Sequence, residues 1–218
     1  PLVFGDESSG RQRHKVACEV AKVSAANHME VCEHLGRVFG SDPTIKLLPR
    51  FTRLADAGMA AMDLIAKSGG RATYAKVDVS DDASVRAMAE TAIKATGRID
   101  GLINNAAYFR EVKLTPFEEI DPAIWDKIFQ VNVKGVWNCC KAVMPTMRKQ
   151  GSGSIVHIAS VVAVAGQPGY LHYVATKGAV LSMTKGLAKE CGAANVRVNV
   201  IAPGFVITDA TKNRPIEW

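Results

Sequence analysis

Runs of hydrophobic residues alternate with amphipathic stretches in the second half of the chain, and this alternation predicts strands and helices in turn. Ile155, Val156 and Ile158 are β-branched and almost continuous, which is typical of a strand buried on both faces of a parallel sheet. From 170 to 190 the apolar residues recur three and four positions apart, which predicts a helix. Glycine and proline within 166–169 separate the two predicted elements.

The same alternation extends back to about residue 55. Helices are predicted over 55–68, 83–96 and 122–147, and strands over 72–77, 99–103 and 196–202. Strands that alternate with helices indicate a parallel sheet with right-handed crossovers. We therefore predict an α/β fold of three layers, a Rossmann-like doubly wound parallel sheet. The pattern does not complete this fold at either end of the chain.

Composition and charge narrow the class of protein. The 218 residues suit one α/β domain, and 48% hydrophobic with 22% charged residues is ordinary for a soluble globular protein. The net charge of +6 comes from scattered basic residues, which favours a solvated surface with some attraction for anionic cofactors over a nucleic-acid partner. The apolar runs are too short to span a bilayer, so we expect no membrane partner. A charged start followed by an apolar core and a cleavage site is absent from the sequence, so we expect no signal peptide.

The cysteines show neither the spacing of a zinc site nor that of a disulfide framework. Two are adjacent and three stand apart, at Cys139, Cys140, Cys18, Cys32 and Cys191. We therefore expect no metal and a reducing, cytoplasmic setting.

Three polar side chains lie where the buried strand ends and the next helix begins. Tyr173 and Lys177 are four residues apart, so they share one helix face, and Ser160 follows the strand at the edge where open α/β sheets bind ligands. A tyrosine has a reference pKa of about 10, which a nearby ammonium lowers. Tyr173 could then exchange a proton with an alcohol or carbonyl oxygen held by Ser160. The hydride of such a reaction must come from a cofactor.

This spacing resembles the short-chain dehydrogenases/reductases, whose signature is a serine followed thirteen positions later by Tyr-x-x-x-Lys. The resemblance runs from about Ala55 to the end of the chain. Other family motifs occur in the family's order: Asp78-Val79, Asn104-Asn105-Ala106-Ala107 with alanine for the last glycine, Asn132 in a long helix, and Pro203-Gly204 followed by Thr208.

The resemblance implies an oxidoreductase that interconverts an alcohol and a ketone with NAD or NADP. It implies Tyr173 as acid/base, Lys177 as the group that lowers the tyrosine pKa and contacts the ribose, Ser160 as the oxygen anchor and Asn132 as the residue that holds a water. The implied cofactor-binding residues are Asp78, Val79, Asn105, Ala106, Tyr173, Lys177, Pro203, Gly204, Val206 and Thr208.

The implied partners are a small alcohol or ketone substrate and further copies of the chain. Related proteins commonly form homodimers or homotetramers through the helices predicted here over 122–147 and 171–190. Those helices carry apolar residues on more than one face, namely Trp137, Met144, Met183 and Leu187. The motifs identify neither the substrate nor a preference between NAD and NADP.

Residues 1–53 do not fit this pattern. A dinucleotide-binding domain should open with a strand and a glycine-rich turn, and neither the glycines at 5 and 10 nor those at 36 and 40 have a suitable context. We leave 1–53 unassigned and place the catalytic domain at 54–218, with a C-terminus shorter than the family's. A non-catalytic or defective family member, acting only as a fold or oligomerisation partner, is therefore the alternative.

Several residues also have structural interpretations. Asp78 could cap the next helix, for which Ser80 and Asp81 are the other candidate caps. The paired asparagines at 104–105 could form a simple turn, and Asn132 could lie on the surface. His157 and His172 are alternative bases, and we favour them less than Tyr173.

Overall fold

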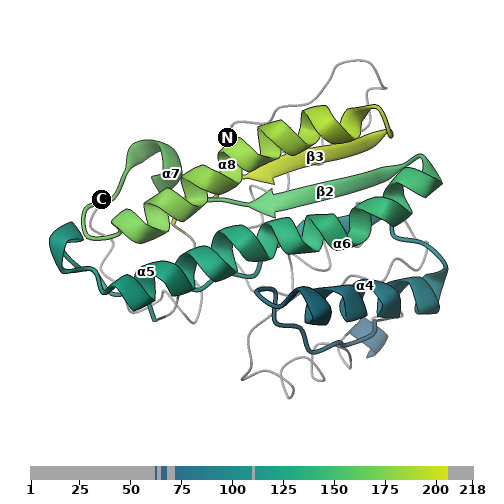
Figure 1. Ribbon diagram of the computed structural model, residues 1–218, viewed down its shortest axis with the longest axis horizontal. Helices are drawn as coiled ribbons and strands as arrows, with labels where there is room; N and C mark the ends of the chain where they lie inside the picture. Colours follow the sequence, from purple (N-terminus) through teal and green to yellow (C-terminus); the bar gives the residue numbers. More distant parts are fainter. Residues whose placement is uncertain (1–61, 63–64, 68–71, 110, 206–218) are drawn as a thin grey trace.

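The structure of the protein, a computed structural model, describes residues 62, 65–67, 72–109 and 111–205 (Figure 1). The strands are β1 (Gly101–Asn104), β2 (Gly153–Ile158) and β3 (Val196–Ile201). The helices are α4 (Asp82–Thr96), α5 (Pro122–Phe129), α6 (Gly135–Gln150), α7 (Val162–Ala165) and α8 (Leu171–Gly192). A 3₁₀ turn, η2, spans Phe117–Glu119, and a π turn, η3, spans Gln130–Lys134.

The strands form a parallel sheet in the order β1-β2-β3. Leu102, Ile155 and Val198 are aligned across the sheet and are each at most 6% exposed. They belong to one hydrophobic core with residues of the flanking helices, including Val85 of α4, Met147 of α6 and Val180 of α8. Buried β-branched and leucine side chains therefore hold the sheet and helices together, as the sequence pattern predicts.

The helices α6 and α8 connect successive parallel strands and cover the same face of the sheet, because right-handed crossovers in one direction place both on one side. In Figure 1 they run side by side, opposite in direction to β2 and β3. The strand arrows point toward the end where α5, α7 and the start of α8 lie. This carboxyl-terminal edge of the sheet is the edge where open α/β sheets bind ligands.

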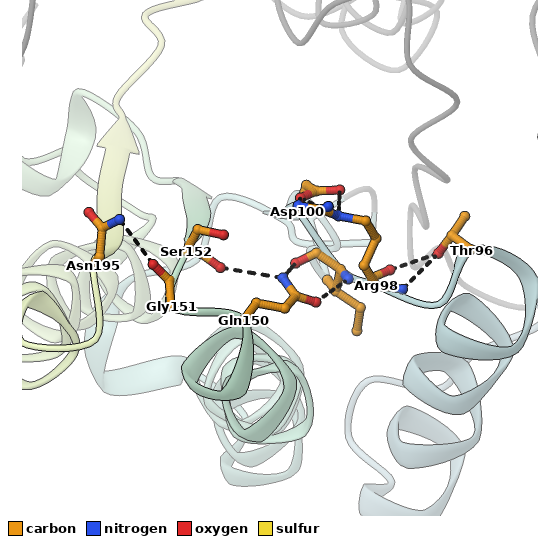
Figure 2. Close-up of polar contacts among 8 residues, drawn as sticks. Thr96, Arg98, Asp100, Gln150, Gly151, Ser152 and Asn195 are labelled. Atoms are coloured by element: carbon orange, nitrogen blue, oxygen red, sulfur yellow. Dashed lines mark hydrogen bonds and ion pairs between the residues drawn. The ribbon is translucent and has the colours of Figure 1, made fainter.

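A cluster of polar contacts fastens the opposite edge (Figure 2). The Gln150 side chain, at the end of α6, accepts a hydrogen bond from Ile99 N and donates to Ile99 O, both at 2.8 Å. It also donates to Ser152 O at 3.4 Å, just before β2, and Asn195 Nδ2 donates to Gly151 O at 3.0 Å. These bonds join the segments that enter all three strands, and so fix the strand register from the amino-terminal side.

Three sequence predictions need correction or limitation. The segment 72–77 forms no ladder with any described strand, although Val77 is buried. Val77 is the only buried residue of this segment, and a strand also needs a neighbour for its hydrogen bonds. The helix predicted over 122–147 is interrupted by η3. Met144, one of the apolar residues from which a subunit interface is inferred, is 9% exposed and belongs to the core.

The described residues show the sheet and one helical layer. The second helical layer of the predicted fold, most of the helix predicted over 55–68 and the unassigned segment 1–53 lie outside the described residues. None of the described helices combines the length and hydropathy that a membrane crossing requires.

Candidate active site

Lys177 is a buried cation at the carboxyl-terminal edge of the sheet. It lies on the inner side of α8 and is only 4% exposed. Its Nζ donates a hydrogen bond of 2.6 Å to the carbonyl oxygen of Ile158, the last residue of β2. Burial lowers the pKa of Lys177 from 10.5 to about 8. The side chain therefore remains largely charged at neutral pH and loses its proton in mildly alkaline solution.

Tyr173 lies one turn before Lys177 on α8, and the lysine Nζ is 5.6 Å from the centroid of its ring. The ring of Phe109 lies 4.7 Å from that of Tyr173, centroid to centroid, and Tyr170 lies 6.4 Å away. These aromatic contacts fix the plane of the Tyr173 ring, which is half-buried. The expected pairing of tyrosine and ammonium on one helix face is therefore present.

Ser160 follows β2 and lies beside the segment that follows β3. Ala159 N donates to Ile201 O at 2.7 Å, and Val161 N donates to Pro203 O at 3.0 Å. The backbone on both sides of Ser160 is thus tied to β3 and its continuation, which brings Pro203 next to the serine. Ser160 is half-buried, and its carbonyl accepts from Ala163 N at the start of α7.

Asn132 lies in the π turn and is 1% exposed, which excludes the surface interpretation. Its Oδ1 accepts from Tyr108 N at 2.7 Å, and its Nδ2 donates at 3.3 Å to Tyr108 O and to Thr176 Oγ1. At the end of the turn Gly135 N donates to Gln130 O, five residues back. The expected break in the helix ladder therefore occurs, and both Asn132 Nδ2 hydrogens are engaged with protein atoms.

Asp78 and Val79 lie just before α4. Asp81 caps that helix, since its side chain accepts from Ala83 N and Ser84 N. Asp78 is exposed and accepts instead from Ser80, at 2.9 Å from N and 2.6 Å from Oγ. The Ser80 hydroxyl is the main reason that the Asp78 pKa is lowered. The helix-cap interpretation of Asp78 is therefore wrong, and its carboxylate keeps an acceptor oxygen at the surface.

The start of α6 positions this segment. Asn138 Nδ2 donates to Val79 O at 2.9 Å. Gly135 lies so close to Val79 that a Cβ added to the glycine would be 2.6 Å from Val79 Cγ2. Asp78 and Val79 are thus held against the same helical run that contains Asn132.

The two asparagines after β1 have different environments. Asn104 is 4% exposed, and its Nδ2 donates to Cys140 Sγ at 3.4 Å, so it points into the core. Asn105 and Ala106 are half-buried and continue toward Tyr108, whose backbone bonds Asn132. Of the remaining predicted residues, Pro203 is half-buried and Gly204 exposed, while Val206 and Thr208 lie outside the described residues.

The two histidines are buried. His157 is fully buried, with Nδ1 2.9 Å from Thr184 Oγ1 and Nε2 3.3 Å from Cys140 Sγ, and burial lowers its pKa to about 4. His172 is 2% exposed, and burial also lowers its pKa. His157 therefore belongs to the core and is held in the neutral form at neutral pH.

The polar side chains at the carboxyl-terminal edge of the sheet fit a nicotinamide dinucleotide. An exposed carboxylate at Asp78 can accept from an adenine amino group, and the Lys177 ammonium lies beside the tyrosine that would exchange the substrate proton. Within 72–109 and 111–205, histidine, cysteine and acidic side chains do not gather in a group that could bind a metal ion.

Thr176 and Phe109 are the site residues that sequence reasoning missed. Thr176 is fully buried between Tyr173 and Asn132, and Phe109 packs on the Tyr173 ring. The position of Thr176, one residue before Lys177 and three after Tyr173, is the only sequence signal that could have identified it.

Comparisons with known proteins agree with this geometry. Residues 47–217 match the family model of the short chain dehydrogenases. Over 163 residues, 73% of this chain and 64% of the relative, the chain is 39% identical to the 3-oxoacyl-(acyl-carrier-protein) reductase FabG of Chlamydia muridarum. It is 42% identical over 139 residues to the FabG of Thermotoga maritima, covering 64% of this chain and 55% of that protein. The chain thus spans less than two thirds of the length of these curated relatives.

A solved structure of NAD⁺-bound xylitol dehydrogenase is similar to this chain with a TM-score of 0.67 and 29% identity. The similarity covers 70% of this chain and 58% of that one. The nicotinamide cofactor in that structure agrees with the cofactor that the polar side chains at the carboxyl-terminal edge fit.

Proposed function

This chain belongs to the short-chain dehydrogenase family, and on that premise we propose that it interconverts an alcohol and a ketone by hydride transfer with NAD or NADP. The observation that supports the proposal most directly is the arrangement of three side chains on two elements. Lys177 and Tyr173 lie one turn apart on α8, and Ser160 follows the strand whose last carbonyl holds Lys177.

Each residue has a distinct role in the proposal. Tyr173 takes the hydroxyl proton of the alcohol during oxidation and returns it to the carbonyl oxygen during reduction. The Lys177 ammonium favours the phenolate form of Tyr173, and the Ser160 hydroxyl holds the substrate oxygen. The bound nicotinamide accepts or supplies the hydride. Asn132 joins the loop after β1 to α8, so that the cofactor-facing and proton-transferring parts of the site stay together.

The proposed cofactor contacts follow the described positions. Asp78 and Val79 face the adenine, Asn105 and Ala106 with Lys177 contact the nicotinamide ribose, and the segment at Pro203 and Gly204 lies beside Ser160 and covers the nicotinamide. Val206 and Thr208 are retained as proposed contacts, although they lie outside the described residues.

The substrate proposed is a small alcohol or ketone. The named relatives are a 3-oxoacyl-(acyl-carrier-protein) reductase and a xylitol dehydrogenase, and reduction of a 3-oxo group converts a ketone into a secondary alcohol. We also propose a reducing, cytoplasmic setting, which the free and buried thiols of Cys139, Cys140 and Cys191 support. Self-association to a dimer or tetramer through α6 is proposed because Trp137 is 47% exposed there.

The test is a turnover assay that follows reduced nicotinamide with a panel of ketones and secondary alcohols. Tyr173→Phe keeps the ring and removes the hydroxyl, so we expect kcat to fall by about two to four powers of ten with cofactor affinity little changed. Tyr74→Phe, which removes a hydroxyl outside the site, is the matched control.

Calorimetry with NAD and NADP complements the assay. Dinucleotide binding without turnover on any substrate would leave the substrate class open. Neither binding nor turnover by the folded chain would contradict the proposal and support the alternative, a non-catalytic member of the family.

A further inference from the structure

We propose that Thr176 is a positioning residue, which fixes the first turn of α8 and thereby holds Tyr173 in register with Asn132 and Lys177. The inference rests on the proposed function, because it assigns a role within the same site. Thr176 is not among the residues that the sequence motifs single out. It lies between the two motif residues of α8 and is fully buried.

Thr176 donates one hydrogen bond and accepts another. Its hydroxyl donates to the carbonyl oxygen of Tyr173 at 2.8 Å, and its Oγ1 accepts from Asn132 Nδ2 at 3.3 Å. A threonine hydroxyl has a single hydrogen, and here the tyrosine carbonyl takes it. The oxygen therefore remains free to accept from the asparagine amide, which has hydrogens to give. Both bonds are satisfied at once, in a place from which solvent is excluded.

The Asn132 side chain extends this connection to a third element. Its amide pairs with the backbone of Tyr108, accepting from N at 2.7 Å and donating to O at 3.3 Å. A continuous path therefore runs from the loop after β1, through the π turn, to Thr176 and the backbone of Tyr173. The π turn contributes to this connection, because it interrupts the regular helix hydrogen bonds at Asn132, the residue that bonds both Tyr108 and Thr176.

The first turn of α8 needs such support. The residue before the helix, Tyr170, gives no side-chain hydrogen bond to the free amides of the turn. Helix ends without a cap tend to fray, and Tyr173 lies in this uncapped turn. Lys177 is anchored one turn later by its bond to Ile158 O. Thr176 adds a second anchor at the backbone carbonyl of Tyr173. The two anchors together hold the distance between the phenol of Tyr173 and the ammonium of Lys177.

The decisive variant is Thr176→Val, which keeps the branched shape and removes the hydroxyl. We expect kcat to fall by about tenfold to a hundredfold, as for a displaced catalytic group, with the KM for the cofactor changed less than kcat. We also expect the pH dependence of alcohol oxidation to shift to higher pH, because a phenol that has moved away from the ammonium ionises at higher pH. Thr176→Ser keeps the hydroxyl, so most of the turnover and the original pH profile should return.

Thr184→Val is the matched control. Thr184 lies on the same helix, is 5% exposed, donates to Val180 O at 2.7 Å and contacts a second side chain, His157. It differs from Thr176 in lying away from Tyr173. Both valine variants should lose comparable stability, but only Thr176→Val should shift the pH profile. An equal shift in both, or an unchanged profile in Thr176→Val, would overturn the proposal.

A readout that needs no turnover separates this inference from the proposed function. The difference in phenolate absorbance between the chain and its Tyr173→Phe variant reports the ionisation of Tyr173 alone. Thr176→Val should move that ionisation to higher pH, whether or not a substrate has been found. If Thr176→Val does not fold, Asn132→Ala removes the bond to Thr176 from the other side, together with the two bonds to Tyr108, and should move the ionisation in the same direction. An unmoved ionisation in the variant that folds would contradict the proposal.

Discussion

Lys177 Nζ lies 2.6 Å from the carbonyl oxygen of Ile158, and Ser160 follows that carbonyl two residues later. One hydrogen bond thus ties the helix that carries the tyrosine to the strand that presents the serine. The carbonyl also partly replaces the water that the buried ammonium has lost. Because that replacement is incomplete, burial lowers the lysine pKa to about 8.

A bell-shaped pH dependence of alcohol oxidation follows from this pKa. The acid limb should follow ionisation of Tyr173. The alkaline limb should fall as pH rises through about 8, because Lys177 then loses the proton that supports the phenolate. Initial rates at saturating substrate, measured between pH 5 and 10, test this. A rate that keeps rising to pH 10 would contradict the lysine assignment.

Lys177→Met and Tyr173→Phe should have different kinetic effects. The tyrosine variant removes only the group that exchanges the proton, so its loss should fall on kcat. The lysine variant removes both the charge near the Tyr173 ring and a donor toward the cofactor, so turnover and cofactor affinity should weaken together. Cofactor titration of both variants beside their steady-state kinetics makes the comparison. Equal cofactor affinity in the two would count against the ribose contact.

Gly135→Ala should disturb the segment that holds Asp78. The added Cβ would lie 2.6 Å from Val79 Cγ2, so Val79 or the start of α6 must move, at a cost of about 1–3 kcal/mol in unfolding free energy. We also expect weaker cofactor binding, because Asp78 adjoins Val79. Chemical denaturation and calorimetry measure the two effects.

Gly186→Ala on α8 is the control for that substitution. A Cβ there meets nothing within 4 Å, so the gain in helix propensity should stabilise the chain by about 0.5–1 kcal/mol. Destabilisation of similar size in both variants would show that the contact with Val79 is not the cause.

His157 should make the folded chain less stable in acid. Its pKa is about 4 in the folded chain and 6.5 in the reference state, so between these values the unfolded chain binds more protons. The unfolding free energy should therefore be unaffected by this group above pH 6.5, and should fall by about 3 kcal/mol as the pH decreases from 6.5 to 4. Urea denaturation across this range, compared with His157→Gln, isolates the contribution. If the unfolding free energy depends on pH equally in both proteins, His157 does not cause the loss of stability in acid.

Trp137→Gln should weaken self-association. Trp137 is nearly half exposed on α6, so apolar surface remains there for a partner copy. The ammonium of Lys141 lies 5.1 Å from the centroid of the Trp137 ring. Light scattering at micromolar concentration should show an oligomer for the original chain and a smaller species for the variant. A monomeric, folded original chain would refute the proposed assembly.

Local patterns were sufficient to predict which side chains lie together on α8. Tyr173 and Lys177 share a helix face because a helix repeats every 3.6 residues, and this spacing is visible in five consecutive residues. The β-branched run of β2 predicted a buried parallel strand for the same reason, since burial on both faces removes alternation. Neither inference needed to know which other part of the chain would be near.

Contacts between distant residues were decided only by the tertiary structure. The bond from Lys177 to Ile158 O spans 19 positions, and the bond from Asn132 to Thr176 spans 44. Asp81 rather than Asp78 caps α4, and the segment 72–77 pairs with none of the described strands. Periodicity specifies which side of an element is apolar, but it carries no information about which backbone carbonyl or amide will meet that side. The path of the chain supplies that information, and it therefore decides which groups surround Lys177 and Thr176.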